Sequence, residues 1–464
     1  MLSPGSALYQ HYKFSVGNNP EKKIAFKVGV NRRYDQLPQN NSIVSVAVAD
    51  EIEAGGKWTS DKGNFFNIQI TNRDLMVLRP DVLLTAKSTK SLIGKVEQQW
   101  VLLNKTIKTN WVYAVTSGQE PKIEYKFVKL DAGRGEFVYI GKDENPNLAL
   151  VQDFRYNPSD PLANYIRVSL YNNEFIRTNN IELNQSIRID LDKLFIPRTE
   201  QSKTKKKMYK SLSRFSFLSN ARIQKRVSEG GTGGLDSYLN FSRQDTGLVA
   251  YTGLYNNTLF FNRGNIYFDL QIGNKRNDSR IVQINGYEDR TRSDYFLKSR
   301  VRIIENLDFI LNSEYGRNQY ASKIFNSRDF DILFYDVFPE INYRPSQNSR
   351  LVTTYSYSNR RQTILGMETS EQHKMTMEFN WRKASLFNID VQVNYIKIFF
   401  TGEANSSIEY DMLEGLKNGN NYVWNVGMTR RLAKSLDLII RYEGRKPGET
   451  ATIHVGQAQV KATF

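Results

Sequence analysis

The sequence predicts an all-β fold, an antiparallel transmembrane β-barrel of the bacterial outer-membrane type. Three observations predict this class: apolar and polar side chains alternate along most of the chain, short and long connections take turns, and the last residue is aromatic. At roughly 25 residues for a strand and its connection, 464 residues give about 16–20 strands. We therefore expect one barrel over residues 1–464.

The alternation has the period of two that a strand shows when one face is apolar and the other is wet. In residues 387–395 every odd position is apolar and every even position is polar. The same pattern recurs at 12–16, 24–30, 181–191, 375–381, 422–428 and 436–442. Helical spacing is hard to find over any comparable length, so strands are the expected elements.

Connections of two lengths follow one another along the C-terminal half. Tight turns of about three or four residues are expected at 305–307, 345–348, 382–385 and 432–435. Longer polar connections are expected near 273–294, 316–330, 359–372 and 401–420. Short periplasmic turns on one rim and long external loops on the other are typical of outer-membrane barrels, and a soluble Greek-key protein has no reason to sort its loops in this way.

A membrane protein with this sequence has to cross with strands. No apolar run approaches the ~18–20 residues of a transmembrane helix, and hydrocarbon leaves only helices or closed barrels. The mean hydropathy of −0.53 is compatible with a barrel, because half of each strand faces a polar lumen. Aromatic residues near strand ends are expected to form two interfacial girdles: Tyr295, Tyr315, Tyr343, Tyr357, Trp381 and Trp424.

The last strand carries a possible assembly signal, because Ala458, Val460, Ala462 and the terminal Phe464 share one face. This tail resembles the C-terminal signal that the barrel-assembly machinery recognises in its outer-membrane clients. The resemblance implies that Phe464 lies at the periplasmic rim. The alternation slips near 456–457, where we expect a bulge or a strand that ends earlier.

Several stretches resemble a group of large, poorly characterised Bacteroidota outer-membrane proteins. They lie at 133–140 (GRGEFVYI), 163–168 (ANYIRV), 172–176 (NNEFI), 259–265 (LFFNRGN), 409–417 (EYDMLEGLK), 442–446 (YEGRK) and 453–456 (IHVG). The resemblance implies the same location and fold, and it carries no established activity. Members of the group are longer at the N-terminus, so the resemblance implies that this chain corresponds to their C-terminal part. The first twenty residues lack the features of a signal peptide.

Composition argues against common catalytic chemistries. The absence of cysteine excludes disulfides, thiolate metal sites and cysteine nucleophiles. Three histidines, His11, His373 and His454, are too few for most zinc hydrolase sites, and none lies in a nucleophile–base motif. We expect no catalytic residue, no cofactor and a non-enzymatic role.

Two acidic segments are candidates for binding divalent cations. Asp143, Asn145 and Asn147 offer oxygen ligands where the resembled group often carries an EF-hand-like loop, although Leu148 replaces the required glycine and the later acid, Asp153, comes one place early. A solvated loop with a decayed motif is the alternative. Loop 401–420 holds Glu403, Glu409, Asp411 and Glu414, which could bind ions that bridge lipopolysaccharide or could simply keep the loop wet.

The charge is strongly basic, with 64 Lys+Arg against 48 Asp+Glu. Lys298, Arg300 and Arg302 form a basic row on the polar face of one strand, which would favour anions in a wet channel or form salt bridges in a plugged one. A lysine-rich run at 203–214 is placed on the periplasmic side by counting strands, where it could meet anionic headgroups or be a plain basic turn.

The leading interpretation is a non-enzymatic, integral outer-membrane barrel that is porin-like and acts in transport or translocation, or as a barrel subunit of an envelope assembly. The first alternative is a plugged barrel whose extramembrane insertion at 129–163 holds a partner; a secreted β-rich adhesin is the second. The expected partners are outer-membrane lipid, lipopolysaccharide, the barrel-assembly machinery during biogenesis and envelope proteins at the external loops. Nucleic acid is not expected.

Overall fold

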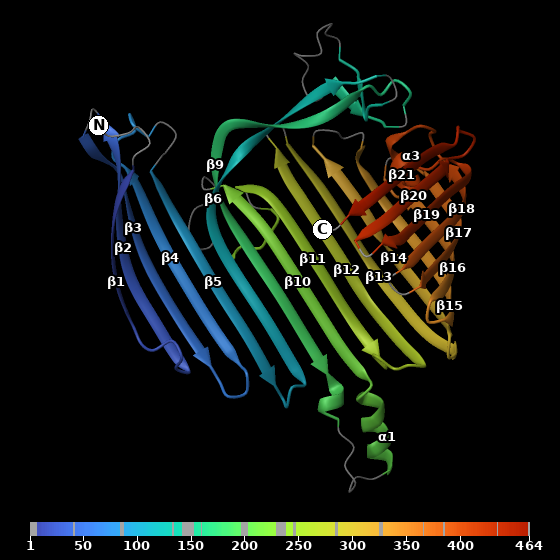
Figure 1. Ribbon diagram of the computed structural model, residues 1–464, viewed down its shortest axis with the longest axis horizontal. Coiled ribbons are helices and arrows are strands. Elements are labelled where there is room, and N and C mark those ends of the chain that lie inside the picture. The colour runs from blue at the N-terminus through green and yellow to red at the C-terminus, as the bar shows by residue number, and fades with distance from the viewer. Residues whose placement is uncertain are drawn as a thin grey trace.

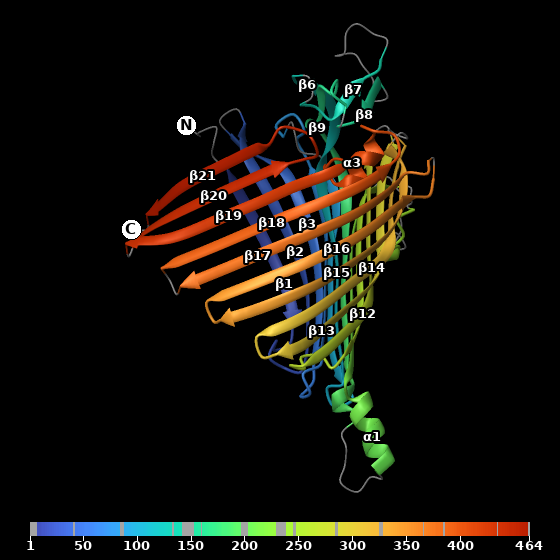
Figure 2. The same cartoon turned by 90° about the vertical axis from the view of Figure 1, so that its right-hand side faces the viewer.

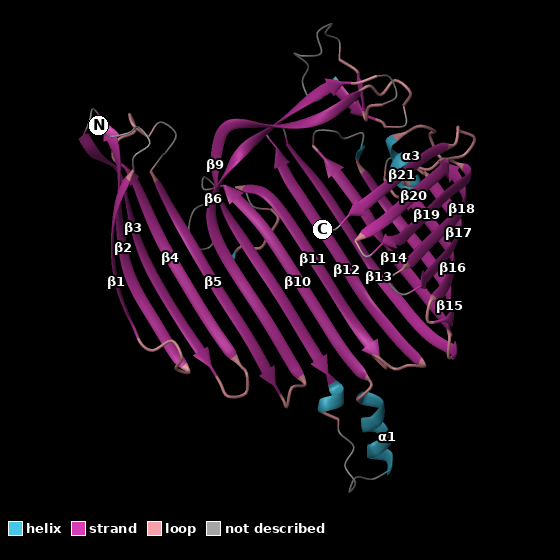
Figure 3. Cartoon of the chain, in the orientation of Figure 1, coloured by secondary structure: helices cyan, strands magenta, loops and turns pink. Residues whose placement is uncertain are grey.

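Nearly all of the chain forms one large, curved antiparallel sheet (Figure 1; Figure 3). The computed structural model describes residues 7–462, apart from 40–41, 84–87, 132–133, 142–152, 159, 196–202, 229–237, 245–246, 284–285, 324–327, 365, 384–385 and 434. Among these residues no helix is both long and apolar enough to span a membrane.

The first part of the sheet contains β1 (Leu8–Gly17), β2 (Ile24–Gln39), β3 (Ser42–Thr59), β4 (Phe65–Val77), β5 (Thr89–Leu102), β6 (Ile107–Lys129), β9 (Tyr165–Asp190), β10 (Phe215–Ser228), β11 (Leu248–Phe261) and β12 (Phe268–Gln283). The second part contains β13 (Gly286–Ile304), β14 (Leu307–Ser322), β15 (Phe330–Ser346), β16 (Ser349–Gln362), β17 (Thr369–Lys383), β18 (Phe387–Thr401), β19 (Gly419–Ala433), β20 (Leu436–Lys446) and β21 (Ile453–Ala462). Two short strands, β7 (Phe137–Tyr139) and β8 (Phe154–Tyr156), lie outside this series.

Each strand of the series pairs antiparallel with the next one, and β6 pairs with β9 across the β7–β8 insertion. Within the described part of the chain, leaving β7 and β8 out of the 21 strands gives 19 in the continuous meander. This confirms the predicted antiparallel outer-membrane-type fold and falls within the predicted 16–20 strands. Among the described residues no pairing joins β1 to β21, so these two strands are the edges of the curved sheet (Figure 2).

The strand alternation sorts the side chains onto two faces. On β17 the apolar Met375, Met377 and Phe379 are exposed on the convex face, whereas Thr376 is buried on the concave one. The same sorting recurs from β1, where Phe14 is 68% exposed, to β18, where Val393 is 49% exposed. The sheet therefore has an apolar outside and a polar inside.

The connections are sorted by rim, as predicted. We call the rim where β21 ends the lower rim, and there β13 and β14, β15 and β16, and β19 and β20 are separated by only two residues. Most upper connections are longer, and they include the β6–β9 insertion and α3 (Ser407–Leu413). The longest lower connection joins β9 and β10, and there α1 (Lys203–Leu212) projects from the rim (Figure 1).

Three of the predicted long loops are partly or wholly strand. Residues 273–294 belong almost entirely to β12 and β13, β14 extends to Ser322, and β16 and β17 fill much of 359–372. The prediction was wrong there because these strand ends are polar on both faces and so lack alternation. The bulge expected near 456–457 was also wrong, since β20 and β21 keep one register from Arg445↔Ile453 to Leu436↔Ala462. Ile453 and Val455 simply lie on the concave side.

Candidate pore wall and external mouth

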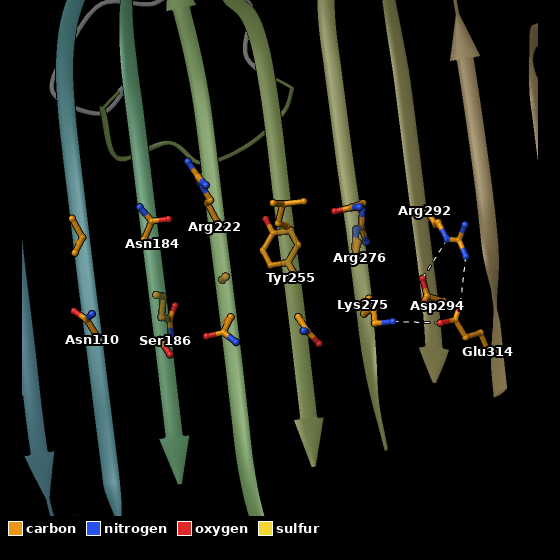
Figure 4. A pocket seen from close by; sticks show the side chains of 17 residues that line it. Asn110, Asn184, Ser186, Arg222, Tyr255, Lys275, Arg276, Arg292, Asp294 and Glu314 are labelled. Carbon is orange, nitrogen blue, oxygen red and sulfur yellow. Dashed lines mark hydrogen bonds and ion pairs between the residues drawn. The ribbon is translucent and has the colours of Figure 1, made fainter. Parts of the chain in front are cut away.

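The concave face carries a polar ladder in the middle of the sheet (Figure 4). Its first rung crosses six strands through direct cross-strand partners: Asn110, Ser186, Asn220, Asn256, Lys275 and Asp294. The next rung includes Asn184, Arg222, Asn277 and Arg292. These residues line a recess of about 780 Å³. Amides and charges on a face of this kind require water or partners, so this wall suits an aqueous lumen.

The predicted basic row lies on the concave face of β13, and two of its three charges are paired. The Arg300 guanidinium lies 2.6 Å from the Asp269 carboxylate, and Arg302 Nε lies 2.8 Å from Asp308 Oδ1. Lys298 has no ion-pair partner within the described part of the chain. The acids come from the neighbouring strands β12 and β14, a pairing that the sequence alone does not reveal.

Further up the wall, basic and acidic side chains also alternate between strands. Glu314 accepts from Lys275 and from Arg292, each at 3.4 Å, and Arg292 lies 3.5 Å from Asp294 (Figure 4). The lumen wall is thus polar and largely charge-compensated despite the basic composition of the chain.

The convex face carries a tyrosine ladder. Tyr295, Tyr315 and Tyr335 are direct cross-strand partners on β13, β14 and β15, and all three are exposed. Tyr343 lies eight residues further along β15 on the same face, which is about 26 Å along the strand. With a tilt of about 40°, the two tyrosine levels are about 20 Å apart, close to the apolar height of about 25 Å in outer-membrane barrels.

Helix α3 folds against the concave face at the upper rim. Met412 and Leu413 are fully buried against Ile396 and Ile398 of β18, together with Phe330 of β15. Ser406 caps the helix by accepting from the Glu409 amide, and Glu414 ends it with φ of 55°. Arg360 anchors the far end, donating 2.5 Å to the Met412 carbonyl and 2.7 Å to the Glu414 carboxylate. The helix is therefore a fixed part of the upper opening of the curved sheet, which we call the mouth.

The carboxylates predicted to gather in this loop do not converge. Glu409 is buried and accepts from the Asn405 amide at 2.5 Å, Glu414 is paired with Arg360, and Glu403 is exposed. Burial raises the pKa of the Asp411 carboxyl, and the nearby Arg328 and Arg290 oppose that shift. No group of three acids or histidines that could hold a metal occurs among the described residues.

The described residues of the predicted insertion at 129–163 belong to the tip of a two-stranded arm. Beyond Gly118 and Thr178, β6 and β9 pair with one another and leave the sheet (Figure 1). At the tip, β7 and β8 enclose a small aromatic core: Phe127, Phe137, Phe154, Tyr156 and Tyr165. The tip reaches the rim at Arg328, whose guanidinium carbon lies 3.6 Å from the centroid of the Tyr156 ring.

A second upper segment, residues 238–243, covers the convex face above the tyrosine ladder. Tyr238 and Phe241 pack on Tyr113 and Ile223, and Arg243 donates to Asp289 and Thr291 at 3.2 and 2.9 Å. Sequence reasoning missed Arg243, Arg328 and Arg360. All three bind partners far away in sequence, so no local pattern marks them.

The remaining predicted residues are placed as follows. Asp143, Asn145, Asn147 and Phe464 lie outside the described residues. Ala458, Val460 and Ala462 share the convex face of edge strand β21. Their role as an assembly signal stays a prediction. His373 and His454 also lie on the convex face, each 2.7–2.8 Å from a tyrosine hydroxyl. The lysine-rich run forms α1 at the lower rim.

No protein-family model matches this chain, and no curated protein does. Solved structures with some likeness include the outer-membrane protein OmpT of Vibrio cholerae, at 7% identity over 87% of this chain and 93% of that one, with a TM-score of 0.28. Its variant lacking loop L8 gives 8% identity, coverage of 92% and 99%, and a TM-score of 0.29. The ferric-catecholate import receptor Fiu of E. coli K12, in its open form, is 7% identical over 94% of this chain and 74% of that one, with a TM-score of 0.29. Because these TM-scores lie below 0.5, the fold assignment rests on this chain's own strand pairing.

Proposed function

We propose that this chain forms the wall of a water-filled outer-membrane pore with a non-enzymatic role in transport or translocation. The observation that carries the proposal is the division of the 19-stranded sheet into an apolar convex face with a tyrosine ladder and a polar concave face. In a membrane the convex face meets lipid and lipopolysaccharide. The compensated polar ladder suits passage of hydrated solutes more than selection of one ion.

A membrane-spanning sheet cannot leave β1 and β21 unpaired, because hydrocarbon offers no partners for their N–H and C=O groups. Both strands run toward the lower rim, so direct pairing would be parallel, unlike the antiparallel pairings of the rest of the meander. The proposal therefore includes a seam filled by an odd number of further strands, which keeps every pairing antiparallel.

The chain has no cysteine, so the seam is testable with cysteine pairs scanned along β1 and β21 in outer membranes. We expect no direct disulfide between the two strands at any register. Efficient cross-linking at one register would show that they pair directly and would overturn the filled seam.

The alternative is a plugged barrel that holds a partner. The observation that favours it is α3, which occupies part of the concave side, together with the aromatic tip of the arm beside it. Single-channel recording separates the two proposals: a conducting pore supports transport, and a folded but silent protein supports the plugged barrel.

A further inference from the structure

The two-stranded arm has the build of a hinged strap. We define the strap as residues 119–129 and 165–177 with β7 and β8. Its base stays joined to the wall, because β9 pairs with β10 as far as Thr178↔Ser228 and Glu120 accepts from Arg226 of β10 through both carboxylate oxygens, at 2.8 and 2.9 Å. Just beyond this pair the register shifts between Pro121 and Ile123. Proline has no N–H to donate, and a bulge interrupts the ladder, so the hydrogen bonding of the strap is broken at this point.

The tip of the strap has an aromatic core of its own. The Phe127 and Phe154 rings stack with centroids 3.8 Å apart and an angle of 11° between their planes. Phe137 is only 1% exposed and packs edge-on against Phe127 and Tyr156, with centroids 5.0 and 5.2 Å away. A tip that carries its own core keeps its shape whether or not it contacts the wall.

The far end of the strap is held by polar and ring contacts. Arg167 lies 2.5 Å from Glu288 at the upper end of β13. Arg328 lies between two rings, 3.6 Å from the centroid of Tyr156 on the strap and 4.9 Å from that of Tyr320 on β14. Contacts of these kinds are specific in geometry but modest in strength, which suits a contact that opens and closes.

The contact at Arg328 joins the strap to the fixed part of the mouth. Tyr320 belongs to the apolar cluster in which Met412 and Leu413 of α3 are packed. The Arg328 charge opposes the rise that burial causes in the pKa of the Asp411 carboxyl of α3. Burial raises the pKa of Tyr156 to about 12, so its ring stays neutral beneath the guanidinium. Figures 1 and 2 both place the strap above the upper ends of β12 and β13, near α3.

We propose that this strap is a hinged element of the external mouth, latched by Arg328. It turns at the Pro121–Ile123 bulge, and release of Arg328 from Tyr156 moves the tip away from α3 and widens the entrance. The movement depends on the strap alone, whereas its effect on conduction rests on the proposed pore function.

The test uses spin labels in the full chain, which has no native cysteine to remove. Leu162→Cys, 70% exposed beside the tip, and Met367→Cys, 85% exposed on the external β16–β17 connection, report the tip-to-rim distance. We expect Arg328→Ala to increase the population at altered distances by about tenfold, the effect of losing a partly buried cation–π contact. The same variant is expected to raise single-channel conductance.

Arg263→Ala is the matched control. It removes a cation–π contact of similar geometry, 4.4 Å from the Phe260 ring, at the opposite rim, and it leaves the distance and the conductance unchanged. Glu288→Gln provides a second way to loosen the tip if Arg328→Ala fails to fold, judged by unboiled gel mobility. Distances that stay the same in both variants would overturn the hinged strap. Distances that shift in a silent barrel would overturn the pore and leave the hinge in place.

Discussion

The middle of the sheet and its upper rim bury apolar side chains in opposite directions. On β18, Val393 and Tyr395 point outward from the convex face, as do their counterparts on the neighbouring strands. A few residues higher, Ile396 and Ile398 point inward and are almost fully buried beneath α3. In the middle, the medium on each side of the wall decides which way apolar side chains point. At the rim, particular segments that fold back onto the sheet decide it.

The same contrast explains what the strand pattern can reveal. Strict alternation over 387–395 marks a wall with water on one side, and its loss over 396–400 marks a level where the inner face is covered, while Lys397 and Phe399 stay exposed on the convex face. On β10 and β11 the covered level lies on the convex side, where residues 238–243 pack on Ile223 and Tyr251. A break in alternation therefore locates a covering segment without identifying it.

The largest expected effect comes from placing a charge on the convex face of the wall. Val393→Arg is expected to destabilise the folded barrel by about 2–4 kcal/mol, because the guanidinium would face lipid. Its neighbour Gln392 faces the lumen, so Gln392→Arg is expected to have little effect. Denaturant titrations of both variants in lipid vesicles measure the difference; equal losses would contradict the assignment of the two faces.

The mouth is expected to respond locally to loss of its core. Met412→Ala leaves a cavity in a fully buried site and should cost about 2 kcal/mol or more in the packing of α3. Hydrogen exchange should show faster exchange in 407–413 with an unchanged β17–β18 ladder. Met367→Ala, at an 85% exposed site on the adjacent connection, is the control. Unfolding of the whole barrel in Met412→Ala would contradict a separable mouth.

Changing charges in the lumen should have a smaller effect than the substitutions in the convex face or in the α3 core. Asp269→Asn with Asp308→Asn frees Arg300 and Arg302 from their partners and should shift selectivity toward anions. The shift should be on the order of twofold or less in permeability ratio, because charges in a wide lumen are screened beyond about 8 Å. Reversal potentials in a salt gradient give the ratio. A shift toward cations would show that the arginines do not face the ion path.

The smallest expected effect is a pH dependence of α3 packing. Burial raises the pKa of Asp411, so the packed helix favours the protonated carboxyl. The stabilisation is complete below the usual aspartate pKa of about 4 and is lost as pH rises through the higher folded-state pKa. Asp411→Asn should remove this dependence, measured as exchange rates in α3 against pH. A wild-type helix that becomes more protected as pH rises would contradict the sign.

Much of the wall could be predicted from the sequence because its rule is local. The alternation predicted the strands and the face of the residues in the wall. Tyr295 and Tyr315, two of the predicted aromatic residues, are cross-strand partners in a ladder that also contains Tyr335, which the sequence reasoning did not name. The upper extensions of β12 and β13 were missed because strand residues above the apolar part of the convex face are polar on both faces, so they show no alternation. The pairing of Arg300 with Asp269 depends on register between strands, which alternation does not encode.

The mouth could hardly be predicted, because its contacts join residues distant in sequence. Arg360 binds the end of α3 more than 50 residues later, and Arg328 meets Tyr156 of the strap. The available signal was the apolar set Ile396, Ile398 and Phe400 on the inner face of β18, which suggests a covered inner wall but not the helix that covers it.

Single-channel recording tests the central claim most directly. The protein purified from outer membranes, with whatever completes its seam, is added to planar bilayers before and after boiling. A polar, charge-compensated lumen predicts steady conductance in the unboiled sample that boiling abolishes. A folded, heat-modifiable protein that stays silent would contradict the water-filled pore.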